Sequence, residues 1–153
     1  MSLEDVKALD DSLTVLKADF DRKDYKAVLA AAPALMSRVG AAQESIASRK
    51  AAEAARAANL TDNWNTLSTQ VPEIVEAVNA RVESLARTKK FPAGMNAAGF
   101  ESTRAAAGEM TQSWQKALGA FANSNMEEAV NSAQAARQKG TEVMSTLQMT
   151  PSS

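Results

Sequence analysis

The residues that most resemble a reactive cluster are five aspartates near the start of the chain. They are Asp10, Asp11, Asp19, Asp21 and Asp24. Clustered carboxylates can bind calcium or another hard cation. Their spacing differs from that of a calcium-binding loop, and no glycine stands among them to make the sharp bend of such a loop. We therefore interpret them as the solvated face of a helix and predict no metal site.

Acid-base and nucleophilic chemistry has few candidate residues. The chain contains no histidine and no cysteine, so it lacks the usual proton carrier near neutral pH and the thiolate nucleophile. Glu127 and Glu128 are adjacent, and on a helix they point about 100° apart, so they do not face a common substrate. No serine stands in a glycine-framed turn, and no glycine-rich phosphate loop is present. We expect a protein that is not an enzyme, with no catalytic residue and no cofactor.

A basic segment with one aromatic side chain is the best candidate for a binding site. It contains Arg87, Lys89 and Lys90, followed by Phe91, and Arg81 lies just before it. These cations could bind an acidic partner. Cations near the C-terminal end of a helix also stabilise that helix through its dipole. Phe91 is an exposed aromatic anchor in one interpretation and a plug that closes one end of a helical bundle in the other.

The overall charge argues against nucleic acid as a partner. Seventeen basic and eighteen acidic residues give a formal net charge of −1, without the basic surface that phosphate binding requires. Charged or amide residues interrupt every apolar run before it reaches the roughly 18 residues of a membrane-spanning helix. We therefore expect a protein partner or self-association, including a homodimer, with no nucleic acid and no integral membrane segment.

The spacing of the apolar residues predicts helices throughout. Alanine makes up roughly a fifth of the chain and is the best helix former. Apolar residues recur in steps of three and four over residues 3–20, 25–46 and 60–85, as they do along one face of a helix. The second of these segments fades beyond Ile46 into "SRKAAEAARAAN", a thinly apolar stretch that we expect to project or to be covered by a second copy.

Prolines and polar turns set the expected boundaries. Pro72 removes a backbone hydrogen-bond donor and predicts a break near Gln70. Pro33 raises the same expectation of a kink or a break in the preceding helix. The segment "TKKFPAGMN" has no periodicity and predicts the one clear interior loop. Helices are then expected over 100–121 and 126–147, with Ser124 or Asn125 as the cap of the last one.

The corner between those last two helices resembles the turn of a tetratricopeptide hairpin. The similarity rests on "ALGAFANSNMEEAVNSA" and on "LKADFDRKDYKAVLAAA", each shorter than twenty residues. It implies a helix hairpin, and it does not carry the family's peptide-binding function, because the usual period of about 34 residues is missing. Weak matches about fifty residues apart, such as those around Trp64 and Trp114, suggest a duplicated unit. Both tryptophans lie on apolar stripes and are predicted in the core, as are Leu118 and Phe121.

The predicted fold is all-α, an antiparallel helical bundle of about five helices, with helical hairpins as its candidate building units. We expect a single domain over residues 1–153, with halves 1–90 and 91–150 as a possible division at the loop around Phe91–Gly94.

The predicted function is that of a non-catalytic helical interaction or structural module, an accessory protein. One alternative is a bundle that binds or senses an apolar small molecule. Another is an amphipathic protein that coats a granule or lipid surface. A chain without cysteine that opens on "SLEDVKALDD" leads us to favour a bacterial protein in a periplasmic or exported location over a cytoplasmic one.

Overall fold

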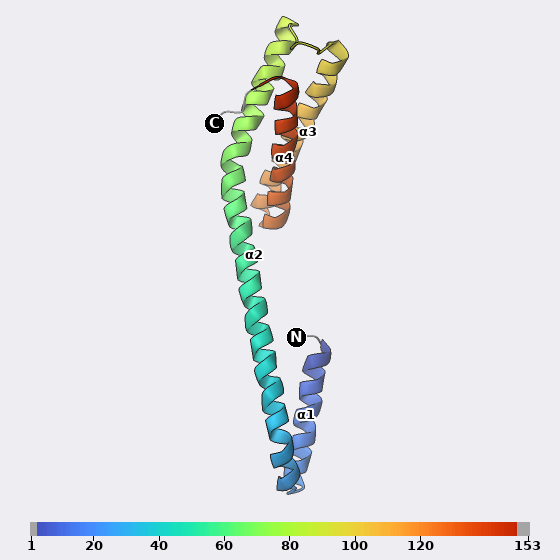
Figure 1. Ribbon diagram of the computed structural model, residues 1–153, viewed down its shortest axis with the longest axis vertical. Helices are drawn as coiled ribbons and strands as arrows, with labels where there is room; N and C mark the ends of the chain where they lie inside the picture. The colour runs from blue at the N-terminus through green and yellow to red at the C-terminus, as the bar shows by residue number, and fades with distance from the viewer. Residues whose placement is uncertain (1–2, 150–153) are drawn as a thin grey trace. The chain divides into compact units, whose positions relative to one another are not determined.

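The computed structural model describes residues 3–149 and contains four helices in that range (Figure 1). They are α1 (Leu3–Asp21), α2 (Tyr25–Thr88), α3 (Ala97–Ala122) and α4 (Met126–Thr146). No strand occurs in the described part of the chain, which confirms the all-α prediction. The chain forms two compact units, unit 1 (Met1–Arg56) and unit 2 (Ala57–Ser153), and α2 contributes to both. The division follows Arg56, whereas the expected halves meet at the loop around Phe91–Gly94.

The prediction of five helices is wrong because the segments expected as separate helices over residues 25–46 and 60–85 form one continuous helix, α2. Its 64 residues include Pro33 and Pro72, and no break occurs near Gln70. Proline has a helical φ near −65°, but inside a helix it removes one hydrogen bond and crowds the carbonyl four residues before it, at a cost of about 3 kcal/mol that other interactions must offset. Around Pro72 the helix is held by packing, since Val71 and Val78 are completely buried. Around Pro33 the neighbouring alanines supply high helix propensity.

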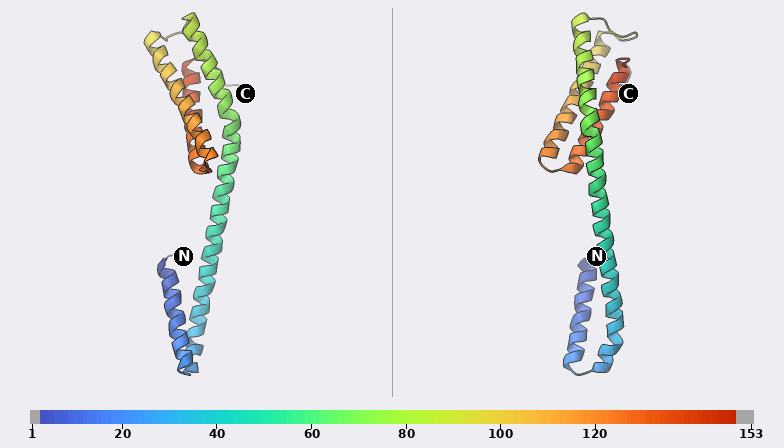
Figure 2. Two further views of the ribbon diagram at one scale, coloured as in Figure 1. Left: turned by 180° about the vertical axis from the view of Figure 1, so that it is seen from behind. Right: turned by 90° about the vertical axis from the view of Figure 1, so that its left-hand side faces the viewer.

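Unit 1 is a helical hairpin made of α1 and the beginning of α2, which lie side by side in all three views (Figures 1 and 2). A short turn joins them, in which Lys23 takes a left-handed φ of 63° and its N–H donates to Phe20 O at 2.9 Å. Asp24 Oδ1 accepts from Ala27 N at 3.1 Å and so caps the first turn of α2.

Unit 2 is a three-helix bundle formed by the end of α2 with α3 and α4. Its buried apolar residues are Trp64, Leu67, Val71, Val78, Val82, Leu85, Phe100, Ala107, Met110, Ala117, Ala120, Ala129, Val130, Ala133, Ala136, Val143, Met144 and Leu147. The alanines on α3 and α4 let the helix backbones approach closely, and Gly140 is buried directly against Ile74 and Met110.

The corner between α3 and α4 confirms the predicted turn. Ser124 takes a left-handed φ of 59°, and Asn125 is the cap, with its Oδ1 accepting from Glu128 N at 3.3 Å. The prediction that Leu118 and Phe121 are core residues is wrong, because they are 45% and 43% exposed. They lie in the last turns of α3, where the chain leaves the bundle to make the corner.

Candidate interaction surface

Unit 1 has no buried side chain among residues 5–56. Nine large apolar side chains of this unit are instead 39–75% exposed to solvent. They are Val6, Leu13, Val15 and Phe20 on α1, and Tyr25, Leu29, Met36, Val39 and Ile46 on α2. Single exposed apolar residues are normal on a protein surface, but a continuous set marks a place where another surface binds.

On α1 the exposed residues form a stripe beside the seam that contacts α2. Val6, Leu13 and Phe20 are seven residues apart and therefore point within about 20° of one another. Leu9 and Leu16 lie between them in the sequence, are half-buried, and line the pockets between α1 and α2. The five residues together have the alternating steps of three and four that are typical of a coiled-coil seam.

On α2 a second stripe runs through Leu29 and Met36, again seven residues apart. At about 100° per residue, the α1 stripe lies about 90° round its helix from the residues that line the contact with α2, and Leu29 and Met36 lie about 150° round α2 in the same rotational sense. Because the helices are antiparallel, both stripes lie toward the same side of the hairpin, with Leu29 and Met36 at its outer edge. At the turn they meet in a ring contact, with the centroids of Phe20 and Tyr25 5.9 Å apart at an interplanar angle of 77°.

We call this surface the apolar face. It consists of Val6, Leu13 and Phe20 of α1 and of Tyr25, Leu29, Met36, Val39 and Ile46 of α2. The apolar spacing over residues 3–20 and 25–46 indicated these stripes, and the prediction placed both helices in a single bundle. Periodicity identifies an apolar stripe but does not say what covers it.

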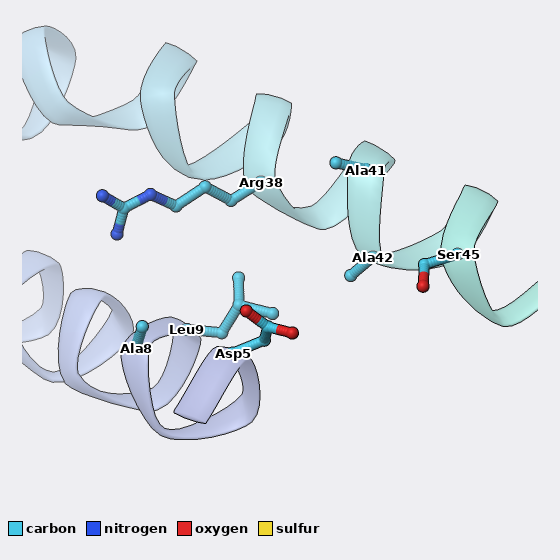
Figure 3. Close-up of a pocket in the computed structure, with 7 residues that line it drawn as sticks. All are labelled: Asp5, Ala8, Leu9, Arg38, Ala41, Ala42 and Ser45. Carbon is cyan, nitrogen blue, oxygen red and sulfur yellow. The ribbon is translucent and has the colours of Figure 1, made fainter. Parts of the chain in front are cut away.

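The opposite side of the hairpin carries polar and small residues and one exposed large apolar side chain, Val15. Arg38 donates from Nη1 to Ser12 Oγ at 2.8 Å. Figure 3 shows Asp5 and Leu9 pointing from α1 toward α2, with the Arg38 side chain extending from α2. These residues border an open pocket of about 310 Å³ with Ala8, Ala41, Ala42 and Ser45. This side provides a natural control surface for the apolar face.

The predicted basic site lies in unit 2, at the end of α2. Arg87, Lys89 and Lys90 are exposed, and Lys89 takes a left-handed φ of 53° where the helix ends. Phe91 is half-buried and stacks on Phe100, with ring centroids 4.9 Å apart. This contact favours the plug over the exposed anchor. Arg87, Lys89 and Lys90 follow one another along the chain at the end of α2, and Phe91 packs against the core of unit 2.

The tryptophans lie in one aromatic stack of unit 2. The ring of Trp64 lies 6.0 Å from that of Trp114 and 4.5 Å from that of Phe121. Trp64 is buried, as predicted, whereas Trp114 is only half-buried. The stack closes the end of the bundle at the α3–α4 corner.

Two acidic residues of α1 form local ion pairs. Lys7 Nζ lies 3.0 Å from Asp11, and Asp19 pairs with Arg22. Within residues 3–149, no group of three or more Asp, Glu, His or Cys side chains is arranged to hold a metal ion. In unit 2, the hydrogen bond and charge of Glu109, 3.0 Å away, raise the pKa of Lys139 above its ordinary value.

Unit 2 also has a surface pocket of about 450 Å³ between α2 and α4. Ile74, Ala77, Met144 and Met149 supply its apolar lining. Its polar lining residues are Gln70, Glu73, Thr141 and Ser145. Both its size and its mixture of apolar and polar groups are in the range of small-molecule pockets.

None of the helices in the described range carries an apolar stretch long enough to cross a membrane. Comparison of the chain with protein-family models, with curated proteins and with solved structures finds no match, so the proposals below rest on the geometry of the chain itself.

Proposed function

We propose that this protein is a non-catalytic helical interaction module and that the apolar face of unit 1 is its binding surface. One observation carries the proposal: unit 1 buries no side chain over residues 5–56, while nine of its large apolar side chains are 39–75% exposed. Unit 2 has its own core, so the two units differ in what they need from a partner.

The stability of a hairpin of two helices depends on the packing of their apolar sides, because helices in proteins gain most of their stability from packing and little from propensity. Leu29 and Met36 are 74% and 75% exposed, so almost none of their packing energy is used inside the hairpin. Complete burial of one such side chain contributes about 1.5–3 kcal/mol. A partner that covers the apolar face therefore stabilises the hairpin as it binds.

The charge distribution favours a protein over an anionic lipid surface. Residues 3–21 contain six acidic and two basic side chains, a formal net charge of −4. Helices that lie on membranes usually flank their apolar side with lysine and arginine. An acidic α1 at the edge of the apolar face repels anionic headgroups.

The experiment compares the full chain with two triple variants. Leu13→Gln/Leu29→Gln/Met36→Gln removes the apolar face without adding charge, and Ala8→Gln/Ala34→Gln/Ala41→Gln places the same group on the opposite side of the hairpin. We expect the unaltered chain and the opposite-side variant to be recovered from producing cells in a stoichiometric protein complex, made with a second copy or with another chain. The apolar-face variant should be recovered alone. Recovery of all three as isolated chains, or equal losses in both variants, would overturn the proposal.

The pocket of unit 2 supports a second candidate function, the binding of a small apolar molecule. Its lining by Met144 and Met149 is adaptable, because methionine has three rotatable bonds and a polarizable sulfur. Native mass spectrometry of the purified chain should then show added mass that is lost in Ala77→Trp, which fills the pocket. A chain of unchanged mass after incubation with apolar ligands would remove this candidate.

A further inference from the structure

The centre of the α1 stripe has a charge pattern that is complementary to itself. Leu13 is flanked on the same side of the helix by Asp10, three residues before it, and by Lys17, four residues after it. Neither Asp10 nor Lys17 makes an ion pair within the described chain. A negative and a positive group thus lie on either side of an exposed apolar residue, about one helical turn away in each direction, and neither is paired within the hairpin.

We infer that the partner of the apolar face is a second copy of this chain, so that two hairpins stack face to face as an antiparallel four-helix bundle. This inference rests on the proposed function of the apolar face. A two-fold axis passing near Leu13 turns the α1 stripe onto its own copy. Asp10 of each copy then lies beside Lys17 of the other, and two ion pairs close the edge of the interface.

The same two-fold axis also places side chains of complementary size opposite one another. Val6 and Phe20 lie seven residues before and after Leu13, so the axis places the small side chain of one copy opposite the large one of the other. Leu13 meets its own copy at the centre. Alternation of small and large residues across an interface is what interdigitating helices require.

The α2 residues of the apolar face are centred on the same two-fold axis. Ser12 and Leu16 line one pocket together with Ala34 and Leu35, so this part of α2 lies level with Leu13. Met36, which is 75% exposed, is the next residue along α2. The axis therefore brings Met36 close to its copy, and the long flexible side chains can pack against each other.

The size of the face is sufficient for a dimer. With 19 residues in α1 and a rise of 1.5 Å per residue, the hairpin is about 28 Å long, and two packed helices are about 20 Å wide. Each copy then covers about 560 Å² in projection, and the pair about 1,100 Å², above the roughly 1,000 Å² expected of a specific interface. Such a dimer turns side chains that now face water into the core of a four-helix bundle.

The test measures the molar mass of the purified full chain over a range of concentrations by sedimentation and light scattering. We expect twice the 16.2 kDa of one chain at micromolar concentrations and above. Leu13→Glu and Met36→Glu should each raise the dimer dissociation constant at least about 100-fold, because each buries two unpaired charges at the axis. Ala34→Glu, on the opposite side of the hairpin, should change it less than about threefold.

A charge exchange tests the arrangement of the two copies. Asp10→Lys and Lys17→Asp, each made alone, place like charges together and should weaken the dimer about tenfold. The double variant Asp10→Lys/Lys17→Asp should restore the original dissociation constant. Failure of this restoration would overturn the antiparallel pairing. Leu13→Cys gives a second measure, because the chain has no other cysteine: a short thiol crosslinker should join two copies, and should not do so in Ala34→Cys.

The outcomes separate this inference from the proposed function. Both tryptophans lie in unit 2, so their fluorescence shows whether each variant keeps the fold of that unit. A purified chain that stays monomeric at all concentrations overturns self-association. If that monomer is still recovered from cells with another protein, through the apolar face, the proposed function survives; if it is recovered alone, both fail. Loss of the chain to lipid vesicles in a flotation assay would identify a membrane surface as the occupant and overturn the second copy.

Discussion

At Gly140 the packing of unit 2 leaves no room for a side chain. A Cβ atom added there overlaps Ile74 Cγ2 and lies 3.0 Å from Met110 Sδ. The methionine side chain can move, but Cγ2 is attached next to the backbone of α2 and has little freedom. The close approach of α4 to α2 at this point therefore requires glycine. Nothing in the sequence pattern distinguishes this glycine from the others, since the contact joins positions far apart in the chain.

We predict that Gly140→Ala lowers the free energy of unfolding of unit 2 by about 1–3 kcal/mol, the usual cost of overpacking. Urea unfolding followed by tryptophan fluorescence measures it. Gly108→Ala is the matched control, because Gly108 is exposed within α3 and has open space around it. Alanine should stabilise that position by about 0.5–1 kcal/mol. Ile74→Ala should reduce the cost of Gly140→Ala; an unchanged cost would show that the overlap is not its cause.

Phe91 provides the second test at the scale of single residues. Its ring stacks on Phe100, which is 2% exposed, so it closes the bundle end from the loop. Phe91→Ala should lower the free energy of unfolding by about 2 kcal/mol, through lost apolar burial and lost ring stacking. Lys90→Ala, at the exposed neighbouring position, should change it by less than about 0.5 kcal/mol. If both substitutions change the free energy of unfolding equally little, Phe91 does not stabilise the bundle and is again a candidate for an exposed side chain that binds a partner.

The helix α4 begins with a reciprocal capping arrangement. Asn125 Oδ1 accepts from Glu128 N, while Asn125 Nδ2 donates to Glu128 Oε2 at 2.9 Å. Lys116 of α3 reaches the same carboxylate at 3.2 Å. The acidic first turn, with Glu127 and Glu128, also suits the positive end of the helix dipole.

Asn125→Ala should therefore lower the free energy of unfolding by about 1 kcal/mol. Asn131→Ala is the control, because Asn131 is exposed inside α4, where alanine is the better helix former. Thermal unfolding followed by far-ultraviolet circular dichroism compares the two variants. A loss of stability in Asn131→Ala as large as that in Asn125→Ala would mean that the capping bonds contribute nothing.

The elements could be predicted well where local chemistry decides them. The first helix, the loop before Asn96, and the turn at Ser124 and Asn125 are all where capping residues and the interrupted apolar pattern place them. The prediction failed at Pro72, because the cost of one lost hydrogen bond is local, whereas the packing of Val71 and Val78 that outweighs it involves distant helices. A rule that predicts a helix break at a proline does not compare the cost of the lost hydrogen bond with the stabilisation from packing against distant helices.

At the scale of the whole molecule, the division into two units was the feature that the sequence predicted least. The apolar steps of α1 and of α2 in unit 1 are as regular as those that form the core of unit 2, yet only the latter are buried. The difference is that unit 2 supplies three helices and unit 1 only two. Every residue from 47 to 59 is exposed, in agreement with the fading of the apolar pattern beyond Ile46. The candidate binding surface was thus visible as a pattern, and only the structure shows it to be uncovered.

Unequal burial predicts unequal protection of the two units from hydrogen exchange. In a dilute solution, where copies of the chain are separate, amides of α1 should open with a free energy between zero and about 2 kcal/mol, because no buried side chain holds that hairpin closed. Amides near Val71, Met110 and Ala133, which are all completely buried, should exchange only through global unfolding of unit 2. Hydrogen exchange read by mass spectrometry at two chain concentrations measures both. If the apolar face pairs with its copy, protection of α1 rises with concentration while that of unit 2 does not, and Met36→Glu abolishes the rise. Strong protection of α1 in the dilute sample would show instead that the hairpin is stable by itself, and that the exposed apolar side chains do not need a partner.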